Sequence, residues 1–143
     1  MEDHAPAFEA NRLAWNERAK LHVGSKFYDV EGFMRGKNTL TAVELELLGR
    51  VEDTDVLHLQ CHFGMDTLSL VRSGARATGL DLSDESIRQA VALSERSGLH
   101  AEWVVSNVLD PRPDLDGRFD TVFTSFGTIG WLPDVKTWAT NIE

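Results

Sequence analysis

One stretch of the chain, VLHLQCHFGMDTLSLVRSGARATGLDLS at residues 56–83, limits the possible folds more than any other. It predicts an apolar strand, a tight turn at residues 61–64, an amphipathic helix, and a second apolar strand that ends on Asp81. Open α/β sheets place ligand sites in this arrangement, across the carboxyl ends of adjacent parallel strands. The stretch therefore predicts an α/β fold and also the position of a binding site.

The rest of the second half of the chain continues the alternation of strands and helices. Strands are expected at residues 55–59, 75–80, 101–106 and 119–125, and helices at 65–73 and 84–97. Elements that alternate in this way form a parallel sheet with right-handed crossover connections. The expected fold is a Rossmann-like, doubly wound parallel sheet with its first four strands only.

An N-terminal helical extension precedes this sheet. Helices are expected at residues 7–23 and 41–48, with a loop at 25–38 that carries apolar anchors. We divide the chain into a helical extension or lid at residues 1–50 and a cofactor-binding domain at residues 51–143. Loop aromatics ahead of a first strand can close a cleft, so Trp15, Tyr28 and Asp29 are candidate lid residues. Helix packing is the alternative role for Trp15.

The end of the sequence follows soon after the fourth expected strand. A further helix begins near Val135, and a sheet of four strands would leave the last one as an edge with unpaired backbone groups. We expect the chain to be a fragment, or its sheet to be completed by something outside this sequence.

Composition limits the class of protein. The 143 residues are 42% hydrophobic, which suits one compact domain, and no run of about 18 apolar residues predicts a membrane helix. The net charge of −9 disfavours nucleic acid, because such binding depends on basic side chains that neutralise phosphates. Cys61 is the only cysteine, so no internal disulfide forms and a cytoplasmic location is expected. The oligomeric state is left open.

The turn after the first strand favours a ligand without phosphates. Gly64 removes a side chain where a ligand would come closest, and Asp81 can accept two hydrogen bonds from a ribose diol. Alternatively, Gly64 only shapes the turn and Asp81 caps the next helix. A dinucleotide needs G-x-G-x-x-G, whereas Gln60 and His62 stand here where glycines are expected. S-adenosylmethionine contains ribose and adenine but no phosphate, so it tolerates these side chains better.

Over roughly residues 40–143 the chain resembles class I S-adenosylmethionine-dependent methyltransferases of the small-molecule type. VLHLQCHFG at residues 56–64 follows that family's VLDLGCGxG pattern, and Asp81 in TGLDLS matches its acid at the end of the second strand. Asn107 in VVSNVLD stands at its adenine-flanking acid, and GRFDTVFTSFG with WLPD corresponds to its fourth-strand region. One bacterial branch keeps QCHFG in this turn.

The resemblance implies methyl transfer from S-adenosylmethionine to an undetermined small molecule. The residues that it assigns to cofactor binding are Gln60, Cys61, His62, Gly64, Asp81, Leu82, Asn107, Val108 and Ser125. It implies that Leu82 packs against the adenine ring and that Asn107 faces the adenine amino group. No catalytic residue and no metal ligand are assigned. The alternatives are a non-catalytic module with this fold and, less favoured, a nicotinamide-dependent oxidoreductase.

Several departures from the family pattern leave roles open. His58 stands where the family usually has an acid, and Asn107 replaces an aspartate. Gln60 and His62 either hydrogen-bond the methionine carboxylate or amine, or only rebuild the turn. Asp66 is expected to stabilise the positive end of its helix, with a contact to the methionine ammonium as the alternative.

The remaining candidates for a functional role are aromatic residues, the single cysteine and the histidines. A sulfonium cation favours electron-rich neighbours, which Phe63, Tyr28 or Phe126 could supply, with core packing as the alternative for each. We expect a structural role for Cys61, because the sequence fixes no basic partner for it. The five histidines lack the spacing of metal ligands.

Overall fold

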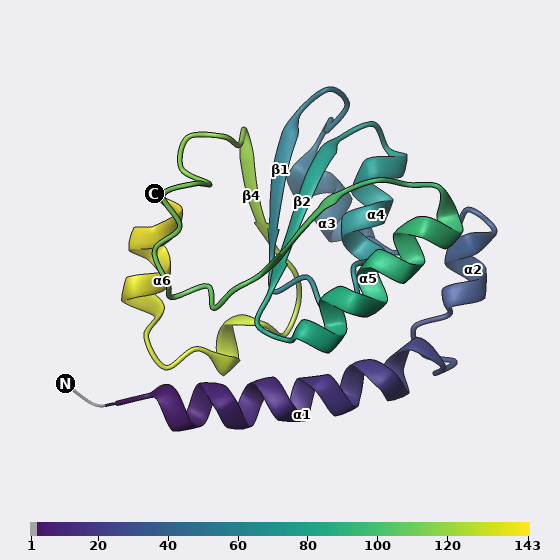
Figure 1. The fold of residues 1–143 in the computed structure, drawn as a ribbon. Coiled ribbons are helices and arrows are strands. Elements are labelled where there is room, and N and C mark those ends of the chain that lie inside the picture. The colour runs from purple at the N-terminus through teal and green to yellow at the C-terminus, as the bar shows by residue number, and fades with distance from the viewer. Residues whose placement is uncertain (1–2) are drawn as a thin grey trace.

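The computed structural model describes residues 3–143 as a parallel four-stranded sheet in the order β3-β2-β1-β4 (Figure 1). The strands are β1 (Asp55–Leu59), β2 (Arg76–Asp81), β3 (Glu102–Val105) and β4 (Thr121–Thr124). All three neighbouring pairs are parallel. The predicted α/β fold is confirmed, with strand boundaries within one or two residues of those expected.

Six α-helices and a 3-10 turn accompany the sheet within the described residues. They are α1 (Ala5–Val23), α2 (Val30–Met34), α3 (Ala42–Leu48), α4 (Met65–Arg72), α5 (Asp84–Ser97), η1 (Ile129–Trp131) and α6 (Val135–Ile142). None of the helices in this part of the chain is long and apolar enough to cross a membrane.

Helix α2 corrects the expectation of a loop at residues 25–38. Asp29 precedes the helix in the left-handed conformation (φ 49°), and its side chain accepts a hydrogen bond from the backbone N–H of Gly32. Phe33 is fully buried and anchors the short helix. Sequence periodicity could not reveal α2, because five residues are too few to show a helical repeat.

Two helix starts were predicted correctly from their caps. Thr41 Oγ1 accepts from the N–H of Glu44, and Glu44 Oε2 accepts from the N–H of Thr41, which completes a capping box at α3. At α5, Ser83 Oγ accepts from the N–H of Ser86, and Gly98 ends the helix in the left-handed conformation. These local signals fix where the helices begin relative to the strand ends.

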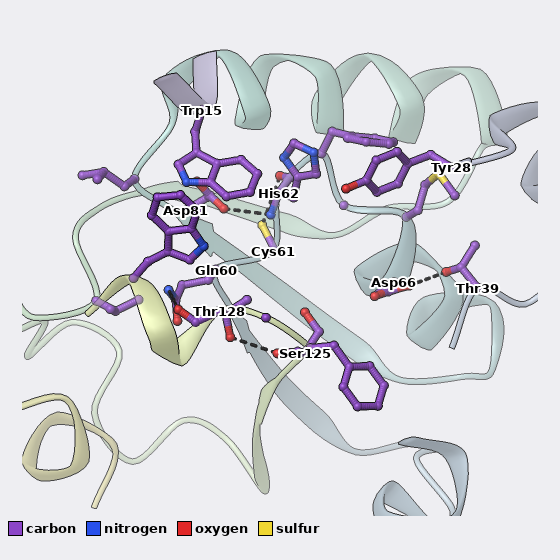
Figure 2. Close-up of a pocket in the computed structure, with 18 of the residues that line it drawn as sticks. Trp15, Tyr28, Thr39, Gln60, Cys61, His62, Asp66, Asp81, Ser125 and Thr128 are labelled. Carbon is purple, nitrogen blue, oxygen red and sulfur yellow. Dashed lines mark hydrogen bonds between the residues drawn. The ribbon is translucent and has the colours of Figure 1, made fainter. Parts of the chain in front are cut away.

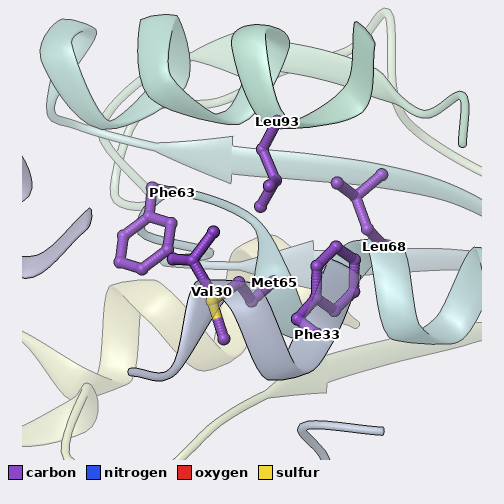
Figure 3. Packing of buried hydrophobic residues seen from close by; sticks show 6 residues of the cluster. All are labelled: Val30, Phe33, Phe63, Met65, Leu68 and Leu93. Atoms are coloured by element: carbon purple, nitrogen blue, oxygen red, sulfur yellow. The ribbon is translucent and has the colours of Figure 1, made fainter. Parts of the chain in front are cut away.

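Helices cover both faces of the sheet. On one face, α2, α4 and α5 enclose an apolar cluster (Figure 3) of Val30, Phe33, Phe63, Met65, Leu68 and Leu93. On the other face, Leu57, Leu59 and Leu80 pack with Trp138 and Ile142 of α6. The alternation along β1 explains this, since successive side chains point to opposite faces of a sheet. The sheet is therefore doubly wound, as predicted.

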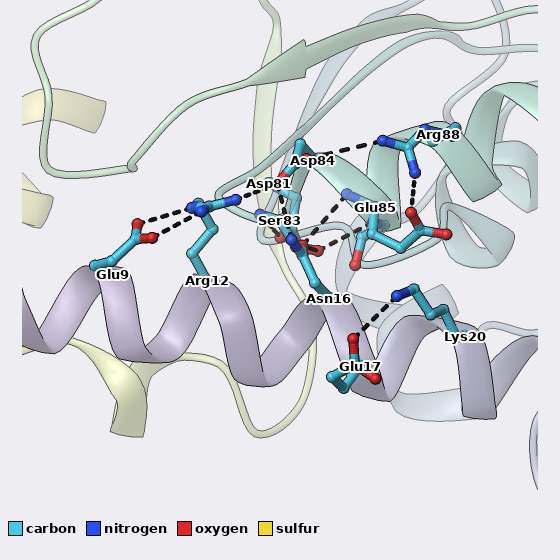
Figure 4. A network of polar contacts seen from close by, with 11 residues as sticks. Glu9, Arg12, Asn16, Glu17, Lys20, Asp81, Ser83, Asp84, Glu85 and Arg88 are labelled. Atoms are coloured by element: carbon cyan, nitrogen blue, oxygen red, sulfur yellow. Dashed lines mark hydrogen bonds and ion pairs between the residues drawn. The ribbon is translucent and has the colours of Figure 1, made fainter.

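Helix α1 packs beside α5, near the carboxyl end of β2 (Figure 1). Arg12 Nη1 lies 2.7 Å from Asp84 Oδ1, and Asn16 Nδ2 donates to the same carboxylate at 3.0 Å. Asn16 Oδ1 also accepts from Ser83 Oγ at 2.6 Å (Figure 4). These contacts hold the N-terminal helix beside the strand ends where the ligand site was expected.

Candidate functional site

A cavity of about 520 Å³ lies at the carboxyl ends of the parallel strands. It is bounded by the turn after β1, the end of β2, the segments after β3 and β4, and parts of the N-terminal segment (Figure 2). All nine residues that the resemblance assigns to cofactor binding line it: Gln60, Cys61, His62, Gly64, Asp81, Leu82, Asn107, Val108 and Ser125. Their contact with a cofactor stays a prediction, whereas their convergence on one cavity is a property of the structure.

The turn after β1 keeps a glycine-like backbone although two of its positions carry side chains. Gln60 (φ 52°), His62 (φ 53°) and Gly64 (φ 81°) are all left-handed. For a residue with a Cβ this conformation costs about 1–2 kcal/mol. The surrounding structure therefore imposes the turn on Gln60 and His62, and the backbone path matches what glycines would adopt.

The side chain of Gln60 is only half satisfied by the protein. Its Nε2 donates to the carbonyl oxygen of Thr128 at 3.0 Å. Its Oε1 is buried and has no hydrogen-bond partner within residues 3–143. A buried acceptor without a donor is costly, so an orphaned oxygen beside a cavity indicates room for a donor on a ligand.

Gly64 has a packing role that the sequence did not reveal. A Cβ at this position would lie 2.4 Å from Cη2 of Trp103 on β3 and 3.1 Å from Cβ of Ala90 on α5. We expected Gly64 to clear space for a ligand. The structure places it at the cavity, and it also shows that the missing side chain makes room for the indole of Trp103.

Asp81 holds the turn and the next helix together at the end of β2. Its Oδ2 accepts from the N–H of His62 at 2.8 Å, and its Oδ1 accepts from the N–H of Ser83 at 2.8 Å. Burial raises the pKa of this carboxyl group, and the backbone donors oppose that rise. Ser83, not Asp81, is the N-cap of α5, and a carboxylate has about four acceptor positions, so Asp81 can hold both backbone N–H groups and still accept from a ligand.

His58 replaces the usual acid with a neutral link between two elements. It is buried, with Nδ1 2.7 Å from Thr67 Oγ1 on α4 and Nε2 3.2 Å from Ser125 Oγ after β4. Burial lowers the pKa of His58 to about 3, so its imidazole is neutral. It supplies no charge to the cavity and instead positions Ser125, which lines it.

An aromatic cluster from α1 and the following loop covers the turn. The Trp15 and His62 rings lie 5.3 Å apart, His22 stacks on Tyr28 at 4.7 Å, and His22 Nδ1 is 2.9 Å from His62 Nε2. Burial, followed by the neighbouring His22, lowers the pKa of His62 to about 4. Trp131 extends the cluster at 5.4 Å from Trp15.

The candidate lid residues have different positions in the structure. Trp15 and Tyr28 line the cavity, but Asp29 does not; it caps α2 and pairs with Lys37 at 3.2 Å. Asp29 is therefore a capping residue, because its left-handed backbone directs its carboxylate at the start of α2. The ring of Phe126 is 69% exposed at the cavity wall.

Two other candidate residues, Phe63 and Cys61, are buried. Phe63 belongs to the apolar cluster between α2, α4 and α5, although it also borders the cavity. Burial raises the pKa of the Cys61 thiol well above its usual range, which disfavours the thiolate.

Within residues 3–143, no three histidine, cysteine or acidic side chains converge as metal ligands.

Sequence reasoning missed much of the cavity wall that comes from the N-terminal segment. The additional lining residues from this segment include Phe8, Lys37, Thr39 and Glu44, and Thr128 after β4 was also missed. No local motif marks them, because their partners lie far away in sequence: Thr39 Oγ1, for example, donates to Asp66 Oδ1 at 2.6 Å. The sequence could have predicted Trp131 as a lining residue, because it belongs to the WLPD motif.

Comparison with known proteins gives matches over the same region. A family model described as a methyltransferase domain matches residues 56–142. A ubiquinone biosynthesis O-methyltransferase from Xanthomonas euvesicatoria pv. vesicatoria is 30% identical over 115 residues, which cover 78% of this chain and 48% of that protein. The chain thus spans about half the length of the curated relatives that it matches.

Solved structures share the fold. A putative S-adenosylmethionine-dependent methyltransferase from Methanococcus maripaludis has a TM-score of 0.70 at 15% identity, covering 89% of this chain and 57% of its own. Magnesium protoporphyrin IX methyltransferase from Synechocystis PCC 6803, solved with bound S-adenosylmethionine, has a TM-score of 0.64 at 15% identity. That match covers 99% of this chain and 71% of the other. At such low identity both likenesses describe the fold alone.

Proposed function

The chain belongs to the methyltransferase domain family, and on that premise we propose that it binds S-adenosylmethionine and transfers its methyl group to a small molecule. One observation carries this proposal. The nine residues assigned to the cofactor by resemblance come from four separate strand ends, yet they line a single cavity. A site assembled from separate segments is difficult to explain by local structural needs alone.

The cavity suits the size and chemistry of this cofactor. Its volume of about 520 Å³ lies within the range of small-molecule sites. Asp81 would accept hydrogen bonds from the ribose hydroxyls, and Leu82 with Val108 would flank the adenine. The orphaned Oε1 of Gln60 would accept a hydrogen bond from a donor on the cofactor, and the hydroxyl of Ser125 would face the methionine arm. These placements are part of the proposal.

The bound cofactor supplies a methyl group already activated by a positively charged sulfur. The chain's own residues then have to bind, orient and exclude water. The rings of Trp15 and Tyr28 cover the turn and would shield the reacting groups, and ring faces favour a nearby cation. Holding donor and acceptor in line supplies much of the rate. We propose that the helices before residue 50 act as this cover.

The acceptor that we propose is a small molecule rather than a nucleic acid or a membrane. The net charge of −9 opposes binding to phosphates, and Lys37 is the one lysine or arginine among the described residues that line the cavity. The named O-methyltransferase relative acts in ubiquinone biosynthesis, which fits a small acceptor without identifying the one used here. We propose a cytoplasmic location, because a chain whose one cysteine is Cys61 uses no internal disulfide.

Calorimetric titration with S-adenosylhomocysteine, the product of methyl transfer, tests the proposal. The wild-type chain should bind it, while NADH should not bind. Asp81→Asn should weaken binding by at least about 10-fold, because a charged hydrogen-bond acceptor contributes about 1.5–3 kcal/mol. Asp116→Asn, on an exposed loop, is the matched control and should leave the affinity unchanged.

Each rival function predicts a different result. Tight NADH binding without S-adenosylhomocysteine binding would favour the oxidoreductase. Affinity that survives Asp81→Asn would contradict the proposed ribose contact. A chain that binds the cofactor but transfers no tritiated methyl group to any compound in a metabolite extract would be a non-catalytic module.

A further inference from the structure

We propose that Asp66, oriented by Thr39, binds the α-ammonium group of the methionine arm of S-adenosylmethionine. The inference rests on the proposed function and adds a residue at the end of the cavity away from Asp81. In Figure 2, Asp66 and Thr39 lie together, well separated from Asp81 and Gln60, with Tyr28 above them. Thr39, Asp66 and Tyr28 all line the cavity.

Among the described residues, three carboxylates line the cavity, and Asp66 is the one that accepts no hydrogen bond from a backbone N–H. Asp81 accepts a backbone N–H on each oxygen. Glu44 uses Oε2 to accept from the N–H of Thr41 in the capping box of α3. Asp66 accepts only from the hydroxyl of Thr39, on Oδ1, and within residues 3–143 its Oδ2 has no hydrogen-bond donor. That oxygen is therefore available to a donor on a ligand.

The protein also leaves Asp66 without a cation. Lys37, the one lysine or arginine among the described residues of the cavity wall, pairs with Asp29 at 3.2 Å. No ion pair to Asp66 is formed by the residues that the structure describes, and the nearby Glu44 adds a second negative charge. His58 cannot take over the role, because its imidazole is neutral and hydrogen-bonded on both nitrogens. A positively charged group on a ligand would compensate this carboxylate.

A hydroxyl chain fixes the orientation of the carboxylate. Because Asp66 only accepts when ionised, the Thr39 hydroxyl donates to it at 2.6 Å. The Ser69 hydroxyl, 2.9 Å from Thr39 Oγ1, then donates to Thr39, and Ser69 Oγ accepts from the N–H of Thr39. Carboxylates held in this way are preorganised for a ligand, which limits the entropy lost on binding.

Burial explains why such a carboxylate needs a partner. It raises the pKa of Asp66 to about 6, against the opposing hydrogen bond from Thr39. A buried charge without compensation destabilises the empty protein. The structural alternative, in which Asp66 only stabilises the N-terminus of α4, would not require its carboxylate to line the cavity. The two roles of Asp66 predict different effects of a substitution on ligands with and without the ammonium group.

Two ligands that differ in one group separate these readings. S-adenosylhomocysteine carries the α-ammonium, and its deamino analogue keeps the carboxylate but lacks the ammonium. The wild-type chain should prefer the first by about 10- to 100-fold, the range for a hydrogen bond to a charged group. Asp66→Asn should lose this preference by weakening S-adenosylhomocysteine alone, since the amide can still accept from Thr39. Calorimetry with both ligands measures the effect.

Glu44→Gln is the matched control, because it removes a neighbouring charge from the same cavity and keeps an oxygen to accept from Thr41. It should retain the preference for the ammonium ligand. Equal weakening of both ligands by Asp66→Asn, or unchanged affinity for both, would overturn the inference and leave the proposed function standing. A wild-type chain that binds neither ligand would overturn the proposed function, and the inference with it.

Discussion

The two walls of the cavity are held in different ways. The strand-end wall, residues 60–66 and 81–83, is fixed by its backbone: Cys61 N–H donates to the carbonyl of Leu80 at 3.0 Å. The N-terminal wall, residues 8–44, reaches the sheet at the cavity mainly through side chains, as in the pairs His22–His62 and Thr39–Asp66. A wall held by side chains separates more easily than one built into a sheet. The difference fits the cover that we propose for the helices before residue 50.

The largest effect should come from the strand-end wall. In Gly64→Ala the new Cβ would meet the Trp103 ring at 2.4 Å in a left-handed backbone. Overpacking and backbone strain together should reduce the free energy of unfolding by about 3 kcal/mol or more. Gly98→Ala, with a similar φ of 70° and no heavy atom within 4 Å, should cost about 1 kcal/mol. Urea denaturation measures both; equal losses would show that crowding at Trp103 is unimportant.

A lower pH should destabilise the protein through His62, which lies where the two walls meet. Burial lowers the pKa of His62 to about 4, below its ordinary 6.5, so the unfolded chain takes up this proton first. Neutral His62 contributes fully to the free energy of unfolding above pH 6.5, and this contribution is lost as the pH falls through 4. The free energy of unfolding should decrease by about 2–3 kcal/mol over this range. His62→Asn, which tolerates the left-handed backbone, should flatten the stability profile between pH 6.5 and 4; an unchanged profile would contradict this assignment.

A smaller effect is expected from the tie between α1 and α5. Asn16→Ala removes the contacts to Ser83 and Asp84 and should cost about 1–2 kcal/mol. Lys20→Ala on the same helix breaks only an exposed pair with Glu17 and should cost less than about 0.5 kcal/mol. Proteolysis should cut α1 faster in Asn16→Ala than in Lys20→Ala. The same cleavage rate in both would mean that the N-terminal wall does not depend on this tie.

The same comparison explains what could be predicted from the sequence. The strand-end wall depends on local signals: short continuous apolar strands, a turn glycine at Gly64 and an N-cap at Ser83. All nine candidate site residues, most of them within or next to such elements, line the cavity as a result. Even here the packing of Gly64 against Trp103 stayed hidden, because Gly64 lies in the turn after β1 whereas Trp103 lies on β3, far away in sequence.

The N-terminal wall escaped prediction for physical reasons. Its contacts join residues far apart in sequence, such as Asn16 and Ser83, and no periodic pattern encodes a pairing of that kind. Helix α2 was missed because its start depends on Asp29 adopting a left-handed backbone, which its residue type permits without requiring. The roles of His22 and Thr39 become visible only once the chain is folded.

The central claim is that both walls enclose one S-adenosylmethionine site. Amide hydrogen exchange with and without saturating S-adenosylhomocysteine tests it most directly, because each wall is observed separately. We expect slower exchange at residues 60–66 and 81–83 of the strand-end wall, and at residues 12–28 and 37–41 of the N-terminal wall. Protection of the strand-end side alone, or of neither side, would contradict it.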